Sequence, residues 1–110
     1  MKDVIRVRIA VKVTTKERSF NYYYKSKNAF LYTVCFIKQK RKVIKPYDID
    51  GFVEDGVYYL DFYFKMHPDA KPPKLSFGLR IFYKSKEIKT EINILSISVF
   101  DKDDVLIFSV

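Results

Sequence analysis

The chain has 110 residues, of which 48% are hydrophobic, 31% charged and 17% aromatic. This length and composition predict one globular domain over residues 1–110 and exclude disordered and collagen-like chains. The net charge is +8: residues 1–45 carry thirteen Lys and Arg against two acidic residues, and residues 46–110 carry eight against eleven. A basic half attracts polyanions or acidic protein surfaces, although abundant lysine also serves solubility alone.

Alternation of apolar and polar residues with a period of two dominates the chain and is typical of half-buried strands. We predict strands over residues 3–15, 20–24, 29–38, 42–46, 50–54 (the weakest), 57–66, 75–84, 87–100 and 104–110. No window has a period of 3.6 residues, so no significant helix is expected. The predicted fold class is all-β, an antiparallel β-sandwich of seven to eight strands, jelly-roll or immunoglobulin-like, with a small barrel as the alternative.

Turn residues separate these runs. Asp55-Gly56 has the pattern of a type I′ hairpin turn, and residues 84–87 and 101–104 close two further hairpins. Residues 67–74 contain three prolines and are expected to be irregular. The apolar positions change phase at Ile94-Leu95, which predicts a β-bulge or a strand that crosses between sheets.

Two predicted strands, over residues 29–37 and 104–110, have apolar residues on both faces. In residues 29–37, Phe30 and Tyr32 belong to one face, while Leu31 and Cys35 belong to the other. A two-layer protein has one interior, so loops or another protein must cover the second faces, and we favour another protein. Tyr59 and Tyr63 would add contact area. The expected interface residues are Phe30, Tyr32, Tyr59, Tyr63, Leu106, Phe108 and Val110.

Cations and tyrosines of the basic half predict contacts with a polyanion. Single-stranded nucleic acid is the alternative partner, because a basic surface with stacking rings binds it without sequence preference. The candidate residues are Arg6, Arg8, Lys12, Tyr22, Tyr24, Lys25, Lys27, Lys38, Lys40, Arg41, Lys42 and Lys45. Lysines on strands also protect sheet edges from aggregation without any ligand.

Catalytic and metal-binding motifs are not evident. Cys35 and His67 are the single cysteine and histidine, and Cys35 lies mid-strand, where it is expected to pack as a small hydrophobe. The acidic residues at 48–55 and 101–104 are interpreted as solvated turns. Residues 97–103 resemble one loop of the calcium- and lipid-binding β-sandwich modules of signalling proteins, over less than a tenth of the chain. We expect no catalytic residues, metal or cofactor.

These patterns predict a non-enzymatic structural or interaction protein of a larger assembly, with other protein subunits as partners. A small virus or phage particle component fits best, from the size, the all-β pattern, the basic half and ends expected to be ordered. The amino terminus lacks an apolar signal segment, and no stretch reaches the roughly 20 apolar residues of a membrane helix. We therefore expect an intracellular or virion protein with no membrane and no small-molecule substrate.

Overall fold

The computed structural model describes residues 3–67 and 73–109, apart from the side chain of Phe108. The predictions for Phe108 as an interface side chain, for Val110, for ordered ends and for most of the 67–74 connection lie outside the described residues. The elements follow one another as β1 (Ile5–Thr15), α1 (Phe20–Lys25), β2 (Ala29–Gln39), β3 (Lys42–Ile44), β4 (Asp48–Glu54), β5 (Val57–Phe64), β6 (Lys74–Tyr83), β7 (Lys86–Ile88), β8 (Thr90–Phe100) and β9 (Leu106–Ser109).

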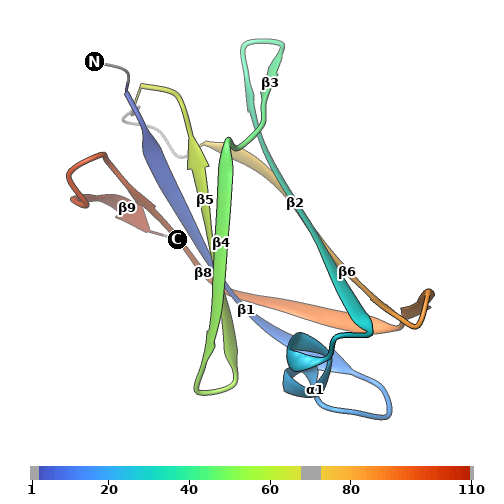
Figure 1. The fold of residues 1–110 in the computed structure, drawn as a ribbon. Coiled ribbons are helices and arrows are strands. Elements are labelled where there is room, and N and C mark those ends of the chain that lie inside the picture. Colours follow the sequence, from blue (N-terminus) through green and yellow to red (C-terminus); the bar gives the residue numbers. More distant parts are fainter. Residues whose placement is uncertain (1–2, 68–72, 110) are drawn as a thin grey trace.

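Two antiparallel sheets form the molecule, which confirms the predicted β-sandwich. The described residues form nine strands, where seven to eight were expected. The five-stranded sheet has the order β4-β5-β1-β8-β9, and the four-stranded sheet has the order β3-β2-β6-β7. Figure 1 shows the two sheets as separate layers, with α1 connecting β1 to β2 at their lower end. An immunoglobulin domain places strands A, B, E and D in one sheet and C, F and G in the other, so the immunoglobulin-like order is not the one found.

The core lies between the sheets and is built from alternate residues of their strands. Ile5, Val7, Ile9 and Val11 of β1 are buried, as their alternation predicts, and they pair with or lie beside Leu60, Phe62 and Phe64 of β5. From the four-stranded sheet, Cys35, Ile37, Leu79 and Ile81 are buried in the same cluster. The alternate residues of β1 therefore point to the outer face of the five-stranded sheet.

The helix α1 corrects the strand that the sequence predicted over residues 20–24. Ser19 caps it, because its side-chain oxygen accepts a hydrogen bond from the Tyr22 backbone N–H at 3.3 Å. Phe20 and Tyr23, three residues apart, bury their rings in the core. Six residues are too few to show a helical period, and the aromatic residues of this run favour strands in isolation.

The predicted turn and bulge are both confirmed. Asp55 and Gly56 have positive φ angles of 52° and 76°, as a type I′ turn requires. In the β1–β8 ladder Ala10 pairs with Ser96 and Val11 with Ile94, so Leu95 is the extra residue of a bulge. The predicted strand over 87–100 also crosses between sheets, because β7 belongs to one sheet and β8 to the other.

Candidate interaction surfaces

The two residues that could form a nucleophile and base lie in different environments. Cys35 is buried in β2, and burial raises the pKa of its thiol to about 12. His67 is exposed, and its Nδ1 lies 2.8 Å from Asp3 Oδ2. The Asp3 hydrogen bond with His67 outweighs the opposing effect of desolvation and lowers the pKa of the Asp3 carboxyl. The thiol therefore lies in the core, whereas the imidazole lies at the surface beside Asp3.

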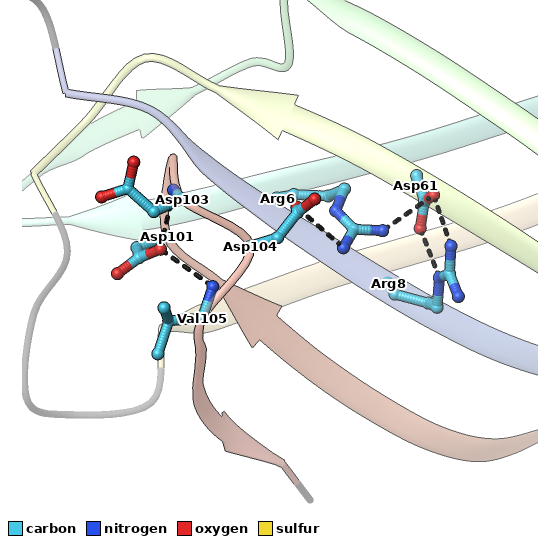
Figure 2. A network of polar contacts seen from close by, with 7 residues as sticks. All are labelled: Arg6, Arg8, Asp61, Asp101, Asp103, Asp104 and Val105. Atoms are coloured by element: carbon cyan, nitrogen blue, oxygen red, sulfur yellow. Dashed lines mark hydrogen bonds and ion pairs between the residues drawn. The ribbon is translucent and has the colours of Figure 1, made fainter.

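A charged network occupies the outer face of the five-stranded sheet (Figure 2). Arg8 of β1 donates hydrogen bonds from Nε and Nη2 to the two carboxylate oxygens of Asp61 on β5, at 2.8 and 2.9 Å. Arg6 Nη1 donates to the same carboxylate at 3.2 Å, and its Nη2 donates to Asp104 at 3.2 Å. Burial raises the pKa of Asp61, but the hydrogen bonds and charges of Arg8 and Arg6 outweigh burial and hold that pKa below its usual range.

Aromatic rings border this network. The Arg6 guanidinium lies 4.3 Å from the centroid of the Phe100 ring, and the Arg8 guanidinium lies 5.3 Å from that of Phe52. Phe52 stacks on Tyr59 with centroids 5.0 Å apart. Arg6 and Arg8, two of the expected polyanion contacts, are thus already neutralised by carboxylates of the protein. Their partner Asp61 is a residue that the sequence analysis missed.

The other expected contact residues on this sheet, Tyr59, Tyr63 and Lys12, lie outside the charged network. Tyr59 and Tyr63 are half-buried, and Tyr63 packs against Tyr47 with ring centroids 6.2 Å apart. Lys12 is exposed and lies opposite Asn93 in the β1–β8 ladder. This face therefore offers the two tyrosines as partly covered rings, and Lys12 as an exposed cation.

The acidic turns hold their own backbone. Asp101 Oδ1 accepts hydrogen bonds from the backbone N–H groups of Asp103 and Val105, at 2.8 and 3.0 Å, which closes the β8–β9 connection (Figure 2). Asp48 and Asp50 lie on the strand β4, not in the solvated turn expected there, and each accepts a hydrogen bond from the backbone N–H of the following residue. Across residues 3–67 and 73–109, no three His, Cys, Asp or Glu side chains gather as metal ligands would.

The outer face of the four-stranded sheet exposes aromatic rings. Phe30 and Tyr32 of β2 are 61% and 45% exposed, and their ring centroids lie 6.4 Å apart. Phe82 of β6 pairs with Phe30 across the ladder, with ring centroids 6.5 Å apart. Arg80 pairs with Tyr32, lies 5.0 Å from the Phe82 ring centroid and donates to Glu87 at 2.6 Å. Phe30 and Tyr32, two of the expected interface residues, thus lie outside the core.

Cations gather at one end of this sheet, around the β2–β3 hairpin. Lys38, Lys40, Arg41, Lys42 and Lys45 are all exposed. Lys38 lies directly opposite Lys74 of β6, which is also exposed. Within the described ranges, none of these six cations forms an ion pair with a carboxylate. They therefore make a concentrated positive surface, which we call the basic hairpin.

The candidate tyrosines and lysines on and beside α1 have different surroundings. Tyr22 is 38% exposed, its hydroxyl lies 3.1 Å from that of Tyr83, and the Arg18 guanidinium lies 4.3 Å from its ring centroid. The hydrogen bond with Tyr83 raises the pKa of Tyr22. Tyr24 is half-buried and donates to the Gly51 carbonyl at 3.3 Å. Lys25 and Lys27 are exposed.

Apolar side chains are exposed along one edge of the five-stranded sheet. Leu106, an expected interface residue, is 51% exposed, and Val105 beside it is 58% exposed. On β8, Ile92, Ile94 and Leu95 are 37%, 45% and 49% exposed. β9 pairs with Ser98–Phe100 of β8, so in the described part of the chain residues 90–97 have β1 on one side and no strand on the other. We call residues 90–97 the open β8 edge.

Comparisons with known proteins return no match to a family model, to a curated protein or to a solved structure. The fold and the surfaces above therefore carry the functional argument alone. Among the described residues, no helix is long and apolar enough to cross a membrane.

Proposed function

We propose that this protein is a non-enzymatic structural subunit of a larger assembly, and that a virus or phage particle is the assembly it fits best. The open β8 edge carries the proposal. A strand edge presents unpaired backbone N–H and C=O groups to any strand that approaches, and proteins usually protect such edges with charges. The small size, the all-β build and the basic half support a particle component.

The two long edges of the five-stranded sheet differ in how many charged residues protect them from pairing with another strand. β4, at the other edge, carries three acidic residues within its seven, namely Asp48, Asp50 and Glu54. The open β8 edge has eight residues and one charge, Glu91, and exposes Ile92, Ile94 and Leu95. An apolar, weakly charged edge, in a sheet whose opposite edge carries acidic residues, favours strand addition by another subunit at β8.

The native mass in solution tests this proposal. The wild-type protein is expected to form a species larger than one chain at moderate salt, and Leu95→Lys is expected to disperse it, because a charged side chain blocks edge pairing. Val43→Lys is the matched control, since Val43 is 56% exposed on β3 in the other sheet. A wild-type protein that stays monomeric at high concentration overturns the proposal. Co-purification with intact particles tests the particle assignment.

A second candidate function is binding of single-stranded nucleic acid, and the basic hairpin favours it. Lys40 and Arg41 occupy the turn with φ angles of 45° and 66°, where Asn-Gly is the favoured pair. Lys38 and Lys74 face each other although like charges directly opposite destabilise a sheet. Cations at two unfavourable places are typical of a surface kept for an anionic ligand.

Two matched turn variants test this candidate. Lys40→Asn/Arg41→Gly removes two cations and relieves the turn, so it is expected to weaken binding of a single-stranded oligonucleotide and to reduce its salt dependence. Lys84→Asn/Ser85→Gly relieves the similar β6–β7 turn, with φ angles of 50° and 67°, and removes one cation elsewhere. Equal oligonucleotide binding by both variants and the wild type overturns this candidate.

A further inference from the structure

The register of the four-stranded sheet joins two sets of residues that the sequence keeps apart. Phe30, Tyr32 and Lys38 are separated by even numbers of residues on β2, so their side chains share the outer face. Their ladder partners on β6 are Phe82, Arg80 and Lys74, in that order. The face therefore has rings at one end, a cation pair at the other, and Arg80 beside the rings.

The rings leave surface open for a planar ligand. Phe30 makes interplanar angles of 34° with Tyr32 and 43° with Phe82, so these neighbours are tilted and not stacked. The Arg80 guanidinium lies over the Phe82 ring, and Glu87 holds it there through two hydrogen bonds, at 2.6 and 3.3 Å. Rings and a guanidinium plane are the groups on which unpaired bases stack.

Small residues of β6 occupy the middle of the face, between the rings and the cations, and Ser76 lies there opposite Phe36. Gly78 of β6 lies opposite Val34, and a Cβ at Gly78 would lie 3.1 Å from Val34 Cγ2. Eight residues separate Phe30 from Lys38, a distance of about 27 Å at roughly 3.4 Å per residue. A strand of several nucleotides can therefore contact both ends of the face.

Charge favours nucleic acid over a protein partner here. On the paired outer positions of β2, β6 and β7, Lys38, Lys74 and Arg80 are cations and Glu87 is the one anion. The basic hairpin continues this charge beyond the end of the sheet. Protein interfaces deplete lysine, whereas a single-strand groove combines lysines that follow the phosphates with rings that receive the bases.

We propose that the outer face of the four-stranded sheet binds single-stranded nucleic acid, with bases stacked on Phe30 and Tyr32 and phosphates on Lys38 and Lys74. This inference rests on the second candidate function and assigns its base-contacting site. Assembly through the open β8 edge involves the other sheet and is compatible with it.

The test compares an oligonucleotide with a polyanion that has no bases. Binding of a labelled oligothymidylate of about 12 nucleotides, and of inorganic polyphosphate, is measured for the wild type and for Phe30→Leu/Tyr32→Leu. Leucine keeps the side chains apolar and removes the rings, so oligonucleotide affinity is expected to fall about tenfold or more while polyphosphate affinity is unchanged. Phe52→Leu, on the outer face of the other sheet, is the matched control and is expected to bind as the wild type does.

Photocrosslinking to an oligonucleotide that contains 5-iodouracil locates the contact directly. Crosslinked peptides are expected to contain residues 30–32 or residue 82. Crosslinks confined to other residues, or an unchanged oligonucleotide affinity in Phe30→Leu/Tyr32→Leu, overturn the stacking site while the charge-based second candidate stands. Failure of the wild type to bind either ligand overturns both. Thermal unfolding of each variant verifies that the fold is retained.

Discussion

Arg8 and Asp61 lie directly opposite each other on β1 and β5 and form a two-pronged hydrogen-bonded ion pair, at 2.8 and 2.9 Å. The Asp61 side chain is 7% exposed, and Arg6 adds a third hydrogen bond to it. β1 is the central strand of the five-stranded sheet, so the pair joins this strand to one of its two neighbours. A carboxylate that is nearly buried and shared by two guanidinium groups forms strong hydrogen bonds, and we expect these to stabilise the pairing of β1 with β5.

Asp61→Asn is expected to destabilise the fold by about 2 kcal/mol, because it leaves the two arginines without their shared anion. Urea unfolding at neutral pH measures this change in the free energy of unfolding. Asp48→Asn is the control, because Asp48 is exposed on β4; its effect is expected to stay within about 0.5 kcal/mol. Equal stability of Asp61→Asn and the wild type would show that the pair contributes nothing.

Acid is expected to weaken the wild type through Asp61. The folded-state pKa of Asp61 is below its ordinary value of 3.8, so the unfolded chain takes up this proton first as the pH falls. The stabilisation is complete above the unfolded pKa and is lost as the pH decreases through the folded pKa. Urea unfolding between pH 6 and pH 2 should therefore show a smaller loss in Asp61→Asn than in the wild type. Parallel pH profiles would contradict this prediction.

The thiol of Cys35 is expected to react very slowly in the folded protein. Its side chain is buried, and burial raises its pKa to about 12, so almost no thiolate is present at pH 8. A thiol reagent such as an aromatic disulfide, added at pH 8, should label the protein quickly in denaturant and slowly in buffer. Rapid labelling of the folded protein, with unfolding excluded by circular dichroism, would place Cys35 at the surface.

The β6–β7 turn is strained, and relief of the strain is expected to raise stability. Lys84 and Ser85 both have positive φ, which costs residues with a Cβ more than it costs glycine. Lys84→Asn/Ser85→Gly should therefore raise the free energy of unfolding by roughly 0.5–1 kcal/mol. Gly56→Ser at the corresponding position of the β4–β5 turn, with a φ of 76°, should lower it by a similar amount. Thermal unfolding of both variants checks the two opposite signs.

Local pattern was sufficient for most of the fold. Period-two alternation predicted the buried face of β1, because successive side chains of a strand point to opposite faces whatever the neighbouring strand is. The pair Asp55-Gly56 predicted the β4–β5 turn, because this turn needs two residues with positive φ and few residue types tolerate positive φ. The phase change at Ile94-Leu95 predicted a bulge or a crossing between sheets, and the structure has the bulge; an extra residue reverses the faces of a strand. Each of these inferences depends on residues close together in the chain.

The partners of each strand were decided by the tertiary structure alone. Asp61 meets Arg6 and Arg8 from more than fifty residues away, and a one-residue shift in pairing would have turned its carboxylate to the other side of the sheet. Burial of Phe20 and Tyr23 made a short helix of a run whose residues favour strands. Sequence alone thus determines which side chains of a strand share a face. The register between distant strands determines which charges and rings meet on that face. That register depends on the packing of the whole core, so it cannot be obtained from any one segment of the chain.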